Sequence, residues 1–135
     1  MTNKHDSPHR RHNPLTGDWV LVSPQRMTRP WQGQTETEVN TELPEYDSDC
    51  YLCPGNERTG GTLNPDYSGT LVFTNDFSAL LEEPPKPIDK ETKHADLFLS
   101  KEVSGTCRVI CFSPNHRLTL PEMGTSAILE VVRTW

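Results

Sequence analysis

The apolar residues of this chain are gathered into a few short runs that are separated by long polar stretches. Three of these runs have the length and the β-branched and aromatic content of strands. Turn-forming residues follow each of them at once, and the runs occupy positions 19–22, 70–74 and 107–112. We expect the third run, which is the most continuous, to be a buried strand. The pattern predicts a protein of short strands joined by long loops.

Near the end of the chain, apolar residues recur at helical spacing, at positions 128, 129 and 132. We expect Thr125 or Ser126 to cap the start of this helix. No Gly, Asn or Pro closes it, and the last residue is the bulky Trp135. The fold class predicted from strands and helix together is α+β, and we expect the chain to be a fragment that continues beyond Trp135.

The remaining stretches predict little regular structure. Residues 1–13 are polar and charged, which is typical of a flexible arm. Residues 32–49 are acidic and follow neither the helical nor the strand period, and residues 80–93 are rich in Pro and charge. We expect all three segments to be loops or surface connections.

Composition narrows the class of protein. With 135 residues, of which 33% are hydrophobic and 12 are Pro, the chain has the length of one domain but predicts a thin core. Such a core suggests that a metal or another chain segment helps to hold the fold. The net charge of −6 argues against a nucleic-acid partner, and no apolar run approaches the roughly 20 residues of a membrane helix. The polar start lacks the core of a signal peptide, so we expect a cytoplasmic protein.

Cys50 and Cys53 form a C-x-x-C pair followed by a Pro-Gly turn. This spacing suits a zinc site, a redox disulfide or an inert pair, and a cytoplasmic setting favours zinc. His116, on a turn after a predicted strand, is the best third ligand, while no fourth ligand is visible. Cys107 and Cys111, four positions apart, are interpreted as small buried hydrophobes.

Two polar groups are candidates for ligand contacts. Arg26 and Arg29 stand beside a tryptophan, and their guanidinium groups suit phosphate oxygens, although a solvated loop is the simpler alternative. Asn75 and Asp76 end a predicted strand, where ligand contacts are common but where Asn and Asp also simply stop strands. On residues alone, two readings stay open: a zinc-stabilised α+β module with anion contacts, and a zinc-dependent interaction module without catalysis.

Six runs of the sequence, in order and at fitting spacing, resemble the amino-terminal part of the galactose-1-phosphate uridylyltransferase family. They are HRRHNPLTGDWVLVSP (9–24), RPWQG (29–33), DCYLCPGN (49–56), NPDYSGT (64–70), VFTNDF (72–77) and RVICFSP (108–114). The resemblance extends over essentially the whole chain, so residues 1–135 are expected to be the amino-terminal segment of a uridylyltransferase domain.

The resemblance implies a member of the histidine-triad superfamily, a homodimer whose α+β subunits form an open half-barrel of mostly antiparallel strands with flanking helices. It implies exchange of UMP between UDP-glucose and galactose 1-phosphate, giving UDP-galactose, through a covalent uridylyl-histidine intermediate. The nucleophile lies in a His-Pro-His motif, which this sequence lacks. We therefore expect the 135-residue chain to be inactive by itself. A related nucleotidyltransferase or phosphorylase for another sugar phosphate, and a non-catalytic zinc module, remain alternatives.

The resemblance also implies roles for individual residues. The zinc ligands would be Cys50, Cys53 and His116, with a fourth ligand, another histidine, just before the nucleophile and downstream of this chain. The nucleotide-sugar site would use Arg26 and Arg29, reaching it from the neighbouring subunit, and on the uridine side Thr59, Asn75, Asp76 and Phe77. Thr59 departs from the family pattern, because an apolar residue is usual at that position.

Overall fold

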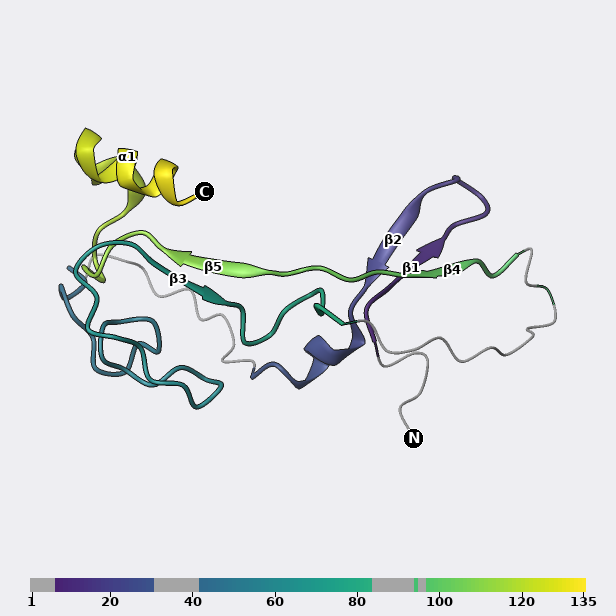
Figure 1. Cartoon of the computed structure of the whole chain (residues 1–135), viewed down its shortest axis with the longest axis horizontal. Helices are drawn as coiled ribbons and strands as arrows, with labels where there is room; N and C mark the ends of the chain where they lie inside the picture. Colours follow the sequence, from purple (N-terminus) through teal and green to yellow (C-terminus); the bar gives the residue numbers. More distant parts are fainter. Residues whose placement is uncertain (1–6, 31–41, 84–93, 95–96) are drawn as a thin grey trace. The chain divides into compact units, whose positions relative to one another are not determined.

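The structure is a computed structural model that describes residues 7–30, 42–83, 94 and 97–135. The chain separates into two compact units, one made of Met1–Trp31 and Phe77–Cys107 and the other of Gln32–Asp76 and Arg108–Trp135. Both units contain antiparallel strands, and the second also contains the α-helix (Figure 1). The predicted α+β class is confirmed.

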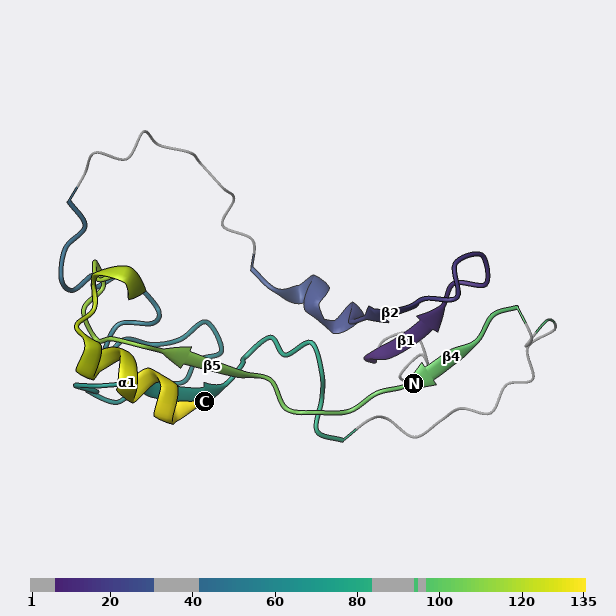
Figure 2. The ribbon, with the colours of Figure 1, turned by 90° about the horizontal axis from the view of Figure 1, so that it is seen from above.

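The first unit is built on a three-stranded antiparallel sheet with the order β2-β1-β4. β1 (His9–His12) lies between β2 (Trp19–Val22) and β4 (Ser100–Glu102), as Figure 2 shows from above. The turn between β1 and β2 is closed by the Asn13 N–H, which donates to the Asp18 carbonyl at 2.8 Å. The predicted strand at 19–22 is therefore confirmed, whereas β4 was not predicted.

The prediction that residues 1–13 form a flexible arm was wrong for the part that the structure describes. Pro8 is fully buried, His9 is 5% exposed, and β1 is the central strand of its sheet. The Arg10 guanidinium of β1 lies 5.6 Å from the centre of the Trp19 indole, and the Lys101 ammonium of the neighbouring β4 lies 5.0 Å from it. Cation–π contacts of this kind stabilise a strand whose hydrophobicity alone would not predict it. Residues 1–6 lie outside the described residues.

The 3-10 helix η1 (Pro24–Thr28) follows β2 directly. Two side chains at its start connect it to the later segment of the same unit. Ser23 Oγ donates to the Ala79 carbonyl at 2.8 Å, and Gln25 Nε2 donates to the Ser78 carbonyl at 3.1 Å. These bonds fix the position of η1, which carries Arg26 and is capped by Arg29.

The second unit contains a two-stranded antiparallel sheet of β3 (Leu71–Thr74) and β5 (Arg108–Cys111), in which Leu71 pairs with Cys111 and Thr74 with Arg108. The strands predicted at 70–74 and 107–112 are confirmed, with ends that differ by one residue. The expectation that the second of them is buried was too strong, because Val109, Ile110 and Cys111 are half-buried and Arg108 is exposed.

The 3-10 helix η2 (Leu120–Glu122) leads into α1 (Thr125–Thr134). The residue that caps α1 is Gly124, and no side chain makes a cap hydrogen bond. The expectation that Thr125 or Ser126 caps the helix was therefore wrong, because the helix already includes both residues.

The core is thin, as the composition predicts. Among the described residues, the buried apolar side chains in the second unit are Cys53, Met123 and Val131. Residues 42–49 contain neither helix nor strand, in agreement with the loop predicted there, while 31–41 and 84–93 lie outside the described residues. No helix in the described part of the chain is long and apolar enough to cross a membrane.

Candidate metal centre

The two thiols of the second unit are presented by consecutive tight turns. The Cys50 N–H donates to the Asp47 carbonyl at 3.3 Å, and the Cys53 N–H donates to the Cys50 carbonyl at 3.2 Å. Gly55 follows with a φ of +75°, a conformation that glycine adopts without strain and that ends the turn. The local sequence, with its Pro-Gly pair, thus brings both sulfur atoms to one side of the loop.

Side chains from the following segment donate hydrogen bonds to every backbone carbonyl of residues 50–53, the turn that is called the metal turn below. Asn56, Asn64 and Tyr67 supply the donors. Asn56 Nδ2 donates to Cys50 O at 2.8 Å, Asn64 Nδ2 to Tyr51 O at 3.0 Å and Cys53 O at 3.1 Å, and the Tyr67 hydroxyl to Leu52 O at 2.8 Å. Because these bonds fix the backbone, the thiol pair is held in place by the protein itself.

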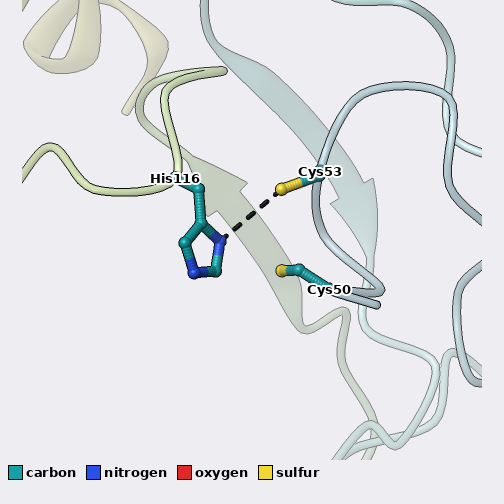
Figure 3. Close-up of side chains that lie close together, drawn as sticks. All are labelled: Cys50, Cys53 and His116. Atoms are coloured by element: carbon teal, nitrogen blue, oxygen red, sulfur yellow. Dashed lines mark hydrogen bonds between the residues drawn. The ribbon is translucent and has the colours of Figure 1, made fainter. Parts of the chain in front are cut away.

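His116 completes the group from a different part of the chain. Its backbone N–H donates to the Glu45 carbonyl at 2.8 Å, which fixes the loop after β5. Its Nδ1 lies 3.5 Å from the Cys53 sulfur, and Figure 3 shows the ring facing both thiols. The other ring nitrogen, Nε2, lies 4.0 Å from a carboxylate oxygen of Asp47. The potential ligand atoms of Cys50, Cys53 and His116 all lie within 4.8 Å of one another.

The Cys53–His116 distance can be compared with that of a tetrahedral zinc site. With a Zn–S bond of about 2.3 Å and a Zn–N bond of about 2.0–2.1 Å, the sulfur and nitrogen of two ligands stand about 3.6 Å apart. The Cys53–His116 separation of 3.5 Å agrees with that value. Two thiols and an imidazole are also the donors that zinc prefers. Cys50 and Cys53 are free thiols, as are Cys107 and Cys111, so no disulfide competes for the site.

Burial makes two thiols in and near the site less acidic. Burial raises the pKa of the Cys53 thiol, and the neighbouring Cys50 raises it further. Burial likewise raises the pKa of the Cys111 thiol, although a hydrogen bond from Tyr67 acts in the opposite direction. A metal that binds Cys53 competes with the proton of its thiol. Cys107 and Cys111 are both half-buried, which is less than their interpretation as small buried hydrophobes predicts, and neither belongs to the candidate ligand group.

The structure places the other candidate residues in two regions. Asn75 and Asp76 follow β3 directly, with Phe77 next, and Arg58 Nε lies 3.2 Å from an Asp76 carboxylate oxygen. Thr59 is exposed in the loop beside them. Arg26 and Arg29 belong to the first unit, and both are exposed.

Sequence reasoning missed the residues that support the site. Asn56, Asn64 and Tyr67 stand in stretches rich in Gly and Pro, where Asn is usually a turn former, so nothing in the sequence indicates that their side chains bind the metal turn. Arg58 was also missed. The signal for Arg58 would have been a lone arginine between the thiol pair and a strand that is followed by Asn75 and Asp76.

The fold and the site together define an α+β chain with a Cys-Cys-His group that could hold a metal ion, and comparison with known proteins makes this specific. All residues from 1 to 135 match the family model described as galactose-1-phosphate uridyl transferase, N-terminal domain. The chain therefore belongs to the galactose-1-phosphate uridyl transferase family. The predicted resemblance is confirmed.

Curated relatives agree with this assignment. The chain is 53% identical over 130 residues to a protein of Haemophilus influenzae named galactose-1-phosphate uridylyltransferase, covering 96% of this chain and 36% of the relative. Proteins of the same name from Kluyveromyces lactis and Saccharomyces cerevisiae are 48% and 47% identical, over 96% and 94% of this chain and 36% of each relative. The chain thus spans about a third of the length of the relatives it matches.

Solved structures support the fold. A structure described as that of a uridylyltransferase superposes on 93% of this chain and 32% of its own, with a TM-score of 0.60 and 22% identity. A uridylyltransferase mutant superposes similarly, with a TM-score of 0.59 and 21% identity. At this level of identity the likeness concerns the fold alone.

Proposed function

We propose that this chain is the amino-terminal part of an enzyme of galactose metabolism that exchanges UMP between UDP-glucose and galactose 1-phosphate. The observation that carries the proposal is the family match over all 135 residues. Because the chain spans about a third of its relatives, the activity belongs to the full-length protein. The chain alone, which lacks a His-Pro-His motif, is inactive.

The reaction proceeds in two displacements. A neutral histidine imidazole, outside this chain, attacks the α-phosphorus of UDP-glucose, and glucose 1-phosphate leaves as the uridylyl-imidazole forms. The phosphate oxygen of galactose 1-phosphate then attacks the same phosphorus, which releases the imidazole and gives UDP-galactose. Imidazole is a good nucleophile at neutral pH, and splitting the transfer lets one site serve both sugars.

The residues of this chain bind and orient the nucleotide sugar. Asp76 accepts hydrogen bonds from the ribose hydroxyls, and Asn75 provides a neutral donor beside it. Phe77 and Thr59 line the uridine side. In a homodimer, Arg26 and Arg29 reach the phosphates of a nucleotide sugar that is bound at the neighbouring subunit. Their charges stabilise the transition state there. Their exposure at the end of η1 is consistent with that role.

The metal would be zinc, and Cys50, Cys53 and His116 would hold it together with a fourth ligand, a histidine from beyond this chain. Its contribution would be structural, because four protein ligands would tie the metal turn and the loop after β5 to the segment that bears the nucleophile. The complete subunit forms the open half-barrel of the histidine-triad superfamily, and the protein acts in the cytoplasm.

An assay of the purified full-length protein tests the function. With UDP-glucose and galactose 1-phosphate, we expect UDP-galactose and glucose 1-phosphate, and with UDP-glucose alone we expect UMP bound covalently to the enzyme. Exchange with another sugar phosphate but not with galactose 1-phosphate would contradict the proposed substrate, and no transfer to any sugar phosphate would contradict the proposed chemistry. The 135-residue chain serves as the inactive control.

A further inference from the structure

Arg58 lies in the loop that follows the metal turn, and its side chain reaches the end of β3. The guanidinium carbon lies 4.0 Å from the centre of the Phe73 ring, and Nε lies 3.2 Å from Asp76 Oδ2. The Arg58 side chain is 11% exposed, and that of Asp76 is 21% exposed. The Nε–H bond does not point along this line, so the contact is an ion pair without a regular hydrogen bond. An arginine so enclosed has few other positions to adopt.

The backbone of this loop is fixed as well. The Arg58 N–H donates to the Thr62 carbonyl at 2.8 Å, and the Gly61 N–H donates back to the Arg58 carbonyl at 2.8 Å. Gly61 has a φ of +80°, which closes this turn, and an antiparallel bridge joins Glu57 to Leu63 at its base. The loop is thus a small hairpin that holds Arg58 in one place.

Gly60, at the tip of the hairpin, lies against the same carboxylate. A Cβ atom added at Gly60 would stand 3.1 Å from Asp76 Oδ1 and 3.2 Å from Asp76 Cγ. The arginine therefore lies beside one carboxylate oxygen, and the other oxygen keeps its position because Gly60 has no Cβ atom. A carboxylate has about four acceptor positions, and the ion pair leaves most of them for a ligand.

We propose that Arg58 is a positioning residue and Gly60 a specificity-determining residue, which together orient the Asp76 carboxylate to recognise the ribose hydroxyls of a uridine nucleotide. The proposal rests on the proposed function, which places Asp76 at the ribose. A vicinal diol donates two hydrogen bonds in a fixed geometry, so a carboxylate that is held in one orientation discriminates between ribose and 2′-deoxyribose. A carboxylate that rotates freely does so less well, because binding must first order it.

Binding of UMP and 2′-deoxy-UMP to the full-length protein, measured by calorimetry, tests this role separately from transfer chemistry. We expect wild type to bind UMP more tightly than 2′-deoxy-UMP, by about ten- to a hundredfold, because hydrogen bonds to a charged acceptor are strong. Arg58→Met should remove most of this preference by weakening UMP binding, while binding of 2′-deoxy-UMP changes little. Arg58→Lys, which keeps the charge, should recover part of it.

A second pair of variants covers the case in which Arg58→Met does not fold. Gly60→Ala adds the Cβ that would displace the carboxylate, and Gly69→Ala is its matched control, because a Cβ at Gly69 meets no atom within 4 Å. We expect Gly60→Ala to reduce the preference for UMP severalfold and Gly69→Ala to leave it unchanged.

Asp76→Asn provides the reference for the complete loss of the carboxylate. Once Asp76 is Asn, Arg58→Met should add little further loss, because both act on the same hydrogen bonds. Additive losses, or a wild-type preference that survives in both Arg58→Met and Gly60→Ala, would overturn the inference. If wild type transfers no uridylyl group but binds UMP with the expected preference, the proposed function falls while the ribose-recognition geometry stands.

Discussion

Asn64 supports the metal turn with more than one hydrogen bond. It is 3% exposed, its amide donates to the carbonyls of Tyr51 and Cys53, and its backbone N–H donates to the Asn56 carbonyl at 2.9 Å. One buried side chain thus fixes two of the peptide groups that orient the thiols. The buried polar side chain of Asn64 therefore helps to hold the site in its geometry.

Asn64→Asp tests this role with almost no change of shape. The substitution replaces two donors by a carboxylate that faces two carbonyl oxygens, so we expect a loss of at least about 1–3 kcal/mol in the free energy of unfolding. Tyr67→Phe, which removes one donor to Leu52, should cost less, about 0.5–1.5 kcal/mol. Chemical denaturation of the purified protein measures both, and an Asn64→Asp variant as stable as wild type would contradict the assignment.

The thiol pair is tested by metal content. We expect wild-type protein to carry about one zinc per chain at this site, and Cys50→Ser to lose most of it, because the site would keep too few thiolate ligands. Cys107→Ser is the matched control, since Cys107 is a free, half-buried cysteine outside the ligand group. Equal metal content in wild type and Cys50→Ser would show that the pair does not bind zinc.

At this scale the sequence predicts the ligands but not their supports. Cys50 and Cys53 are recognisable from spacing, and His116 from its place after a strand. Asn64 looks like any loop asparagine, because its role depends on a fold that brings its amide 11 positions back along the chain to Cys53. The role of Arg58 likewise depends on the fold, which brings its side chain to Asp76.

Among the elements, η2 has a local stabilising contact that depends on pH. The backbone N–H and the hydroxyl of Thr119 both donate to one carboxylate oxygen of Glu122, at 2.9 and 2.7 Å. These hydrogen bonds lower the pKa of Glu122 from its ordinary value of 4.5. The carboxylate form is therefore favoured in the folded protein relative to the unfolded chain.

Glu122→Gln should consequently lower the melting temperature slightly at neutral pH. The lowered pKa contributes stability above the ordinary pKa of the carboxyl, and this stability is lost as the pH falls through the folded-state value. The difference between wild type and Glu122→Gln should thus shrink toward about pH 3. Thermal melts between pH 7 and about pH 3 measure it, with Glu83→Gln as the control for removing an exposed carboxylate. A difference that grows on acidification would contradict the assignment.

The elements also show where hydrophobic patterning fails. The strands at 19–22, 70–74 and 107–112 are apolar, and the pattern finds them. β1 is missed because its sequence, HRRH, is stabilised by the Trp19 indole of the next strand rather than by apolar burial. The start of α1 is missed because its cap, Gly124, offers no side chain to recognise.

At the scale of the whole molecule, a thin core would give a bound metal a large share in stability. Few apolar side chains of the described residues are buried, and one of them is Cys53 itself. A metal that binds the folded state and not the unfolded one stabilises it by mass action. Cooperation between a small core and a metal centre is what the composition predicts.

Removing the metal should therefore lower stability more than it changes structure. Because Asn56, Asn64 and Tyr67 hold the turn without help from the metal, we expect a chelator to lower the melting temperature by several degrees while the far-ultraviolet circular dichroism at 25 °C changes little. Restoring zinc should restore the melting temperature. An unfolded spectrum after chelation would contradict the view that side chains pre-form the site.

The most direct test of the central claim, that Cys50, Cys53 and His116 hold zinc in a uridylyltransferase, is X-ray absorption at the zinc edge of the full-length protein. The three ligands of this chain and the histidine proposed as the fourth predict two sulfur neighbours at about 2.3 Å and two nitrogen neighbours at about 2.0–2.1 Å. His116→Ala should retain the sulfur shell and lose one nitrogen. A zinc environment of nitrogen and oxygen alone, or a His116→Ala spectrum identical to that of wild type, would contradict the claim.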